Sequence, residues 1–255
     1  MSAGFFNVYD DRARAAAYSG LEFPGTYYLA FRDLPAILAE HIQGRQAVDF
    51  GCGTGRSTRF LRQLGFDVVG VDISQEMLAQ AGVRDPQGDY RLVPDGDVGG
   101  LSAHRYDLVF SAFTFDNVPT MEKKVALFRS LRLLVKGHGR IVNLVSTPDI
   151  YLNEWASFST RAYPENRNAR SGDKVRIVML DVEDRRPVED ILWTDEDYHA
   201  VYQRAGLTPL HAYRPLAKQT EAFPWVSETT IAPWVIYVLG TAECAKPSSV
   251  PGVTA

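Results

Sequence analysis

Residues 48–58 read VDFGCGTGRST, and this stretch decides the fold. A buried strand, Gln46 to Phe50, runs directly into a glycine loop, and a helix is predicted from Ser57. Glycine has no Cβ, so such a loop brings its backbone close to a ligand and adopts positive φ angles. The spacing is GxGxG, and Arg56 stands where the dinucleotide fingerprint GxGxxG requires a small residue. The stretch therefore predicts a ligand site between strand and helix, and it disfavours NAD.

An acidic residue ends the next predicted strand. That strand runs from Phe66 to Asp72, which places Asp72 17 positions after Gly55. In open α/β sheets, ligands bind outside the carboxyl ends of the strands, and a carboxylate there can accept both hydroxyls of a ribose. Together with the glycine loop, Asp72 predicts an adenosine-type ligand that lacks a diphosphate.

Helices and strands alternate around this unit. Alternation of this kind predicts a parallel sheet with helices on both faces. Two closing strands are expected to be antiparallel neighbours, which gives a Rossmann-like, doubly wound α/β sheet of seven mostly parallel strands with a reversed last strand. A strand pair is predicted inside an insertion at about 147–193. The predicted strands are 46–50, 66–72, 90–93, 106–111, 140–145, 208–213 and 234–240, with the inserted pair at 174–180 and 188–193.

Length, charge and composition restrict the class of protein. The 255 residues are 45% hydrophobic and 23% charged, which is typical of a soluble globular chain. The net charge of −4 and the scattered basic residues disfavour a nucleic-acid partner. Two cysteines form no disulfide framework, and no apolar run approaches the roughly 20 residues that span a bilayer. We expect a cytoplasmic protein with a small-molecule substrate and no membrane partner, and the sequence leaves the oligomeric state open.

From about residue 33 to 240, the order of elements resembles the class I S-adenosylmethionine-dependent methyltransferases. The resemblance implies that S-adenosyl-L-methionine is the cofactor. It implies that the glycine loop holds the amino-acid end of the cofactor and that the acidic end of the next strand binds ribose and adenine. It also implies that an apolar residue packs on the adenine. In this chain these positions are Asp49, Gly51, Cys52, Gly53 and Gly55, then Asp72 and Ile73, and Met77.

Two further motifs follow the same family pattern. Residues 96–98, GDV, resemble the motif whose carboxylate accepts the adenine amino group, which implies Asp97 and Val98, with Asp95 as the alternative acid. Ser111 ends the strand whose exit passes the reactive methyl group in this family. An N-terminal segment folds over the cofactor in similar enzymes, which implies a lid at 1–32 that uses Tyr18. The methyltransferase domain is then expected at 33–242, followed by a disordered tail at 243–255.

The segments after the fourth and fifth strands carry aromatic residues with a few polar groups. This composition suits a small, flat substrate, either heteroaromatic or phenolic. The alternative is that the aromatics only pack the insertion onto the sheet. The aromatic candidates for substrate binding are Phe113, Phe115, Tyr151 and Trp155, with Phe158, Trp193 and Trp225 on the same rim.

Acid–base chemistry has two candidates, Asp116 and Glu154, which either take a proton or orient the substrate. All five histidines fall away from the carboxyl edge of the predicted sheet, so a histidine base is not expected. Two other interpretations stay open. One is a non-catalytic partner that binds S-adenosylmethionine. The other is a metal-dependent catechol-type enzyme with Asp116, Asn117 and Asp149 as oxygen ligands, whereas the leading interpretation includes no metal.

Overall fold

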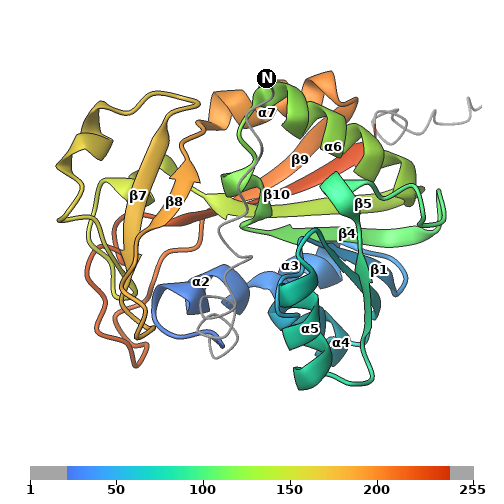
Figure 1. The fold of residues 1–255 in the computed structure, drawn as a ribbon, viewed down its shortest axis with the longest axis horizontal. Coiled ribbons are helices and arrows are strands. Elements are labelled where there is room, and N and C mark those ends of the chain that lie inside the picture. The colour runs from blue at the N-terminus through green and yellow to red at the C-terminus, as the bar shows by residue number, and fades with distance from the viewer. Residues whose placement is uncertain (1–21, 242–255) are drawn as a thin grey trace, which may run out of the picture.

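A seven-stranded sheet forms the centre of the molecule, of which a computed structural model describes residues 22–241 (Figure 1). Its strands are β1 (Gln46–Phe50), β2 (Asp67–Asp72), β3 (Asp89–Leu92), β4 (Tyr106–Ala112), β5 (Val135–Ser146), β9 (Leu207–Tyr213) and β10 (Trp234–Thr241). Their order is β3-β2-β1-β4-β5-β10-β9. The first five are parallel, and β10 is antiparallel to both β5 and β9. This confirms the predicted α/β sheet with its reversed strand.

Helices cover both faces of this sheet. They are α2 (Thr26–Arg32), α3 (Leu34–His41), α4 (Arg56–Gln63), α5 (Gln75–Arg84), α6 (Met121–Leu134) and α7 (Asp195–Arg204). Figure 1 shows α3, α4 and α5 on one face and α6 and α7 on the other. Side chains alternate between the faces of a strand, so Leu108 and Phe110 enter one core while Val109 enters the other. Within residues 22–241, no helix has the length and apolarity needed to cross a bilayer.

Local contacts set the boundaries of several helices. Asp33, which precedes α3, makes no capping bond, because its carboxylate pairs with Arg32 and the chain enters α3 directly from α2. Helix α6 ends at Leu134, because Val135 already pairs with Tyr106 in the sheet. By contrast, the side chains of Ser74, Thr120 and Thr194 cap α5, α6 and α7.

The insertion forms a small antiparallel sheet of its own. It consists of β6 (Phe158–Ser159), β7 (Lys174–Met179) and β8 (Val188–Ile191), and it lies beside α2 and the start of β10 (Figure 1). The pairing of β7 with β8 confirms the predicted strand pair. Ile177 and Met179 pack with Tyr27 of α2 and Trp234 of β10 in one hydrophobic core. The insertion is therefore fixed to the sheet edge where the carboxyl ends of the parallel strands lie.

The part of the N-terminal segment that the structure describes is packed rather than peripheral. In α2, Leu29 and Ala30 have no exposed surface and Phe31 is almost fully buried. This packing places residues 26–32, expected as the end of a lid, within the core of the domain. The expected lid residue Tyr18 lies outside the described residues.

One buried carboxylate joins three segments that are distant in the sequence. Oε1 of Glu228 accepts hydrogen bonds from Oγ1 of Thr26, at 2.6 Å, and from the backbone N of Ala156, at 2.7 Å. Oε2 accepts a third from the backbone N of Val226, at 2.8 Å. Glu228 has no exposed surface. It therefore connects α2, the insertion and the segment that leads into β10.

Replacing Glu228 by Ala is expected to lower the free energy of unfolding by about 2–4 kcal/mol, since the buried hydroxyl of Thr26 and the partly buried amides of Ala156 and Val226 lose their acceptor. Urea denaturation followed by circular dichroism measures the loss. Glu189→Ala is the matched control, because Glu189 only pairs with the exposed Lys174 and such pairs contribute about 0–1 kcal/mol. Equal effects of the two substitutions would contradict this role of Glu228.

Candidate functional site

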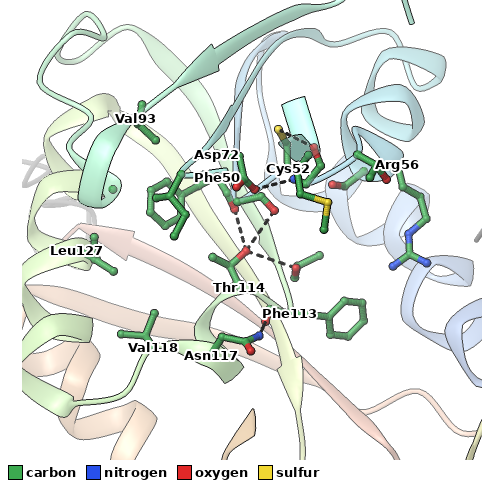
Figure 2. Close-up of a pocket in the computed structure, with 18 of the residues that line it drawn as sticks. Phe50, Cys52, Arg56, Asp72, Val93, Phe113, Thr114, Asn117, Val118 and Leu127 are labelled. Atoms are coloured by element: carbon green, nitrogen blue, oxygen red, sulfur yellow. Dashed lines mark hydrogen bonds between the residues drawn. The ribbon is translucent and has the colours of Figure 1, made fainter. Parts of the chain in front are cut away.

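Two neighbouring cavities lie at the carboxyl edge of the parallel strands. We call the larger one the loop cavity, of about 200 Å³, because the glycine loop lines it (Figure 2). The smaller one, of about 70 Å³, is the insertion cavity, because Ile177, Val188 and Asp190 of the insertion line it. Arg56, Phe113 and Asn117 line both, so a ligand in one cavity is adjacent to a ligand in the other.

The glycine loop has the conformation that its composition predicts. Gly51, Gly53 and Gly55 have φ angles of 73°, 53° and 77°. A Cβ on Gly51 would lie 2.1 Å from Oγ1 of Thr114, whereas a Cβ on Gly53 would meet no atom of another residue within 4 Å. Gly51 is therefore required for the close approach of the glycine loop to Thr114, just after β4, and the open space beside Gly53 leaves room for a ligand.

Asp72 connects this loop to the next strand. Its Oδ2 accepts from the backbone N of Gly53 and its Oδ1 from that of Ser74, both at 2.8 Å. Asp72 also lines the loop cavity. The loop thus holds this carboxylate in one orientation at the wall of the cavity.

The two ends of the loop cavity differ in chemistry. Figure 2 shows the apolar Val93 and Leu127 at one end, and Arg56 with the ring of Phe113 at the other. Ile73 and Met77, both predicted from the sequence, also line the cavity, as do Cys52 and Gly53. An elongated ligand therefore finds an apolar end for a ring and a polar end near the junction with the insertion cavity.

Asp49, Ser111 and Gly55 were predicted as site residues, but they do not line the loop cavity. Asp49 is fully buried and accepts hydrogen bonds through Oδ2 from Ser57, at 2.7 Å, and Thr58, at 2.6 Å. Burial raises the pKa of Asp49 to about 6. Its Oδ1 and the hydroxyl of Ser111 are buried without a hydrogen-bond partner in the described structure. Gly55 is the third of these residues, and a Cβ there would lie 2.4 Å from the hydroxyl of Tyr90.

The predicted adenine-side acid needs correction. Asp97 is exposed and accepts from the backbone N of Gly99, at 2.8 Å, and it lines neither cavity. Val98 is buried in the core beneath the loop. Asp95 and Gly96 line the loop cavity instead, because Asp95 has a left-handed φ of 55° that turns this segment toward the cavity. The sequence motif located the segment but not the residue.

The insertion cavity combines aromatic walls with two buried acids. Tyr27 stacks on Trp234, with ring centroids 5.9 Å apart, and meets Phe158 edge-on at 5.1 Å. Asp116 accepts hydrogen bonds from the backbone N of Ser146, at 3.1 Å, and from its hydroxyl, at 2.8 Å. On the other wall, the hydroxyl of Tyr151 donates to Asp190 at 3.1 Å. These groups form a flat, ring-lined space with hydrogen-bond acceptors at its surface.

The predicted aromatic rim is divided between cavity and core. Phe113, Tyr151 and Phe158 line the insertion cavity. Phe115 instead stacks on Phe128, with centroids 4.1 Å apart, and Trp155 is buried and donates to the carbonyl of Ile150. Trp155 therefore packs within the insertion, as the alternative interpretation expects, whereas Phe115 packs its turn onto α6. Trp193 and Trp225 also line neither cavity.

The second catalytic candidate, Glu154, lies away from both cavities. Its carboxylate accepts from the hydroxyl of Ser159, at 2.9 Å, and the backbone N of Thr160, at 2.7 Å, and it pairs with Arg161. Burial acts to raise the pKa of Glu154, but these hydrogen bonds outweigh it and lower the pKa. Because its oxygens are occupied within its own turn, we withdraw Glu154 as a catalytic candidate.

Asp116 keeps its place at the insertion cavity. Its side chain is almost completely buried, and burial raises its pKa to about 6 despite the hydrogen bonds from Ser146. None of the five histidines, all within the described chain, lines either cavity. Of the three oxygen ligands in the metal-dependent interpretation, Asp116 and Asn117 line the cavity, but Asp149 is exposed and lines neither. Across residues 22–241, no three acidic, histidine or cysteine side chains are grouped to hold a metal ion.

Several cavity residues escaped the sequence analysis. Arg56 served there only as evidence against NAD, yet its guanidinium lies 4.7 Å from the ring centroid of Tyr27 at the junction of the cavities. Because Arg56 directly follows the glycine loop, its place in the sequence could have identified it as a residue of the ligand site. Tyr27 lies in the segment expected as a lid, where Tyr18 was the residue chosen. Asp190 comes from a segment without a motif, so only the packing of β8 brings it to the site.

A seven-stranded sheet with one reversed strand and a glycine-loop cavity at its carboxyl edge is an α/β architecture that suits a nucleoside-type ligand. Residues 48–143 match the family described as "Methyltransferase domain". A crystal structure of an S-adenosylmethionine-dependent methyltransferase from Clostridium acetobutylicum superposes with a TM-score of 0.59 at 14% identity, covering 92% of this chain and 96% of that one. At that identity, the likeness concerns the fold.

Two curated relatives agree in class. The ubiquinone biosynthesis O-methyltransferase of Bordetella avium is 30% identical over 138 residues, which cover 52% of this chain and 48% of that protein. The demethylmenaquinone methyltransferase of Renibacterium salmoninarum is 27% identical over 181 residues, 67% of this chain and 74% of that protein. The chain thus spans about half the length of the first relative. Residues 48–143 thus resemble methyltransferase domains, and the solved structures that share this fold include S-adenosylmethionine-dependent methyltransferases.

We expect Asp72→Ala to weaken the binding of S-adenosylhomocysteine by about 1.5–3 kcal/mol, because a charged acceptor of hydrogen bonds is lost. Isothermal calorimetry on the full chain measures this, with NAD as a competitor that should have no effect. Asp97→Ala serves as the control, since Asp97 is exposed and lines neither cavity. A loss at Asp97 equal to that at Asp72 would restore the original motif assignment.

Proposed function

We propose that this protein transfers the methyl group of S-adenosylmethionine to a small, planar heteroaromatic or phenolic acceptor bound in the insertion cavity. The observation that carries the proposal is the adjacency of the two cavities. Phe113, Arg56 and Asn117 line both, so an acceptor in the insertion cavity lies next to whatever occupies the polar end of the loop cavity.

The residues of the loop cavity suit the parts of this cofactor. Asp72 is oriented to accept hydrogen bonds from ribose hydroxyls, and Met77, Val93 and Leu127 offer an apolar surface to adenine. The open backbone at Gly53 leaves space for the amino-acid end. The bound cofactor supplies a sulfonium methyl group that is open to in-line displacement. A cofactor held in this way would supply its methyl group at the end of the loop cavity that Phe113 lines, beside the insertion cavity.

Positioning is the main contribution of the insertion cavity. Tyr27, Phe113 and Trp234 present ring surfaces that hold a flat acceptor, and the packed insertion limits the access of water. Asp116 is the ionisable group best placed to receive a hydrogen bond from the substrate that is methylated, and to take the proton of that substrate. With a pKa raised to about 6, it is ionised near neutral pH and still basic enough to serve.

The names of the relatives support an oxygenated ring as acceptor. The Bordetella avium relative is named for ubiquinone biosynthesis and for O-methyl transfer. The Renibacterium salmoninarum relative is named for demethylmenaquinone. Quinones and their precursors are flat rings with oxygen substituents, which agrees with aromatic walls that carry carboxylate acceptors.

The test is an activity screen with isotopically labelled S-adenosylmethionine. The purified full chain is incubated with a panel of phenols, hydroxylated quinone precursors and hydroxylated heteroaromatics, and mass spectrometry detects the transfer of the labelled methyl group. A methylated planar product supports the proposal. If the protein binds the cofactor with full affinity but methylates only non-aromatic acceptors, the substrate class is wrong.

Asp116→Asn is expected to lower kcat by about 10²–10⁴-fold if Asp116 takes the proton, and by less if it only orients the acceptor. Because the carboxylate must be ionised to act, parent activity falls as the pH drops through about 6 and reaches a plateau above it. This fall on the acid side of the pH–activity profile, the acid limb, should be absent from the Asn variant. Glu154→Gln is the matched control and stays within a few-fold of the parent. Persistence of the acid limb in Asp116→Asn would assign the titration to another group.

A further inference from the structure

A lysine is completely buried directly behind the insertion cavity. Lys124 of α6 has no exposed surface, which is rare for lysine unless the charge is compensated. Its Nζ donates a hydrogen bond to the carbonyl of Phe115 and lies 5.0 Å from the ring centroid of Trp193 and 5.1 Å from that of Tyr198. The carbonyl oxygen and the two rings therefore hold the ammonium group in one place.

The charged and titratable groups around Lys124 come from several elements. Asp116 lies in the turn η3 (Thr114–Asn117), Asp190 in β8 and Asp197 at the start of α7, and all three favour the protonated lysine. Tyr198 of α7 donates to Asp116 at 3.4 Å, and Tyr151 donates to Asp190. Burial lowers the pKa of Lys124, and these carboxylates oppose that shift. Lys124 is thus the cation that compensates a buried acidic group.

The same lysine acts on Asp116 in two ways. Its charge opposes the effect of burial, which raises the pKa of Asp116. Its hydrogen bond to the Phe115 carbonyl fixes the turn that carries both Asp116 and Asn117. A carboxylate buried without a nearby cation takes up a proton rather than stay charged. Without Lys124, Asp116 would therefore be protonated at neutral pH and unable to accept a proton.

The balance of charge around the insertion cavity also restricts the acceptor. Asp116 and Asp190 line the cavity, Arg56 lines its junction, and Lys124 lies behind it. An acceptor with a carboxylate at the reacting position would face two acids in a buried space. A cationic group would compete with the positive charge that Lys124 already supplies. The arrangement favours an acceptor that enters uncharged and presents an O–H or N–H group.

We propose that Lys124 is a positioning residue that keeps Asp116 ionised, so that the insertion cavity takes an uncharged hydroxyl or amine acceptor. This rests on the proposed function. In the reaction, the acceptor heteroatom uses a lone pair to form a bond to the methyl carbon as the carbon–sulfur bond breaks. That electron pair stays on sulfur, which becomes a neutral thioether. The proton of the acceptor passes to the Asp116 carboxylate and from there to solvent.

The first test needs no acceptor. Infrared difference spectra of the full chain at pH 7, each taken against the matching Asp116→Asn variant, report the protonation of Asp116. The parent should show a carboxylate band, and Lys124→Met should show the band of a protonated carboxylic acid. Lys124→Arg should restore the carboxylate, and Lys174→Met, at an exposed lysine of the insertion, should behave as the parent. A carboxylate band in Lys124→Met that is as strong as in the parent overturns the inference.

The second test uses an acceptor found in the activity screen. In Lys124→Met, the acid limb of kcat/KM should move to higher pH by about one unit or more, since Asp116 loses its compensating cation. Lys124→Arg should return it toward the parent. A limb that does not move overturns the inference. An absence of any methylated product argues against the proposed function, while the infrared result still decides the role of Lys124.

A double variant tests the inference if Lys124→Met alone fails to fold. If Lys124→Met does not fold, Lys124→Met/Asp116→Asn should fold and bind S-adenosylhomocysteine, because neither Lys124 nor Asp116 is then left buried and charged without the other. A double variant that also fails to fold shows that Lys124 acts through packing alone and overturns the inference.

Discussion

The junction between β1, β2 and the glycine loop is the constraint on which the site depends. The backbone amides of Gly51 and Cys52 both donate to the carbonyl of Val71, at 2.8 and 3.0 Å, and the carboxylate of Asp72 receives the amide of Gly53. Three left-handed glycines make this crossing possible. The turn directs α4 away from the sheet edge, leaves the loop cavity open, and places Arg56 at its polar end.

A second layer of structure converts a cofactor cavity into a site with two compartments. The insertion, α2 and the start of β10 meet around Thr26, Ser157 and Glu228, whose hydrogen bonds replace the solvent that these buried polar groups would otherwise require. Tyr27 is the next residue after Thr26, and the indole of Trp234 donates to the carbonyl of Thr26. Both Tyr27 and Trp234 line the insertion cavity. The proposed acceptor chemistry therefore depends on elements that share no sequence motif with the cofactor loop.

Motifs in this chain identified segments more reliably than individual side chains. The sequence motif at 96–98 pointed to the correct turn, but the left-handed φ of Asp95 decided which carboxylate faces the cavity. Phe115 and Asp116 are neighbours in η3, yet one enters the core against Phe128 and the other faces the insertion cavity. Glu154 had the right chemistry and the right approximate place, but hydrogen bonds within its own turn occupy its carboxylate. Side-chain direction in turns depends on local φ and ψ, which composition does not specify.

The sequence alone predicted the sheet, the glycine loop and Asp72 beside it, because these follow from hydrophobic periodicity, glycine spacing and residues that lie close together along the chain. The class of cofactor came from the resemblance of these motifs to a known family. Three caps and the inserted strand pair also rest on local signals. Only the tertiary structure decided that Tyr27, Asp190 and Lys124 surround the same buried space as Asp116. Those residues come from α2, β8 and α6, and their proximity arises from packing between distant segments, for which a single sequence carries no periodic signal.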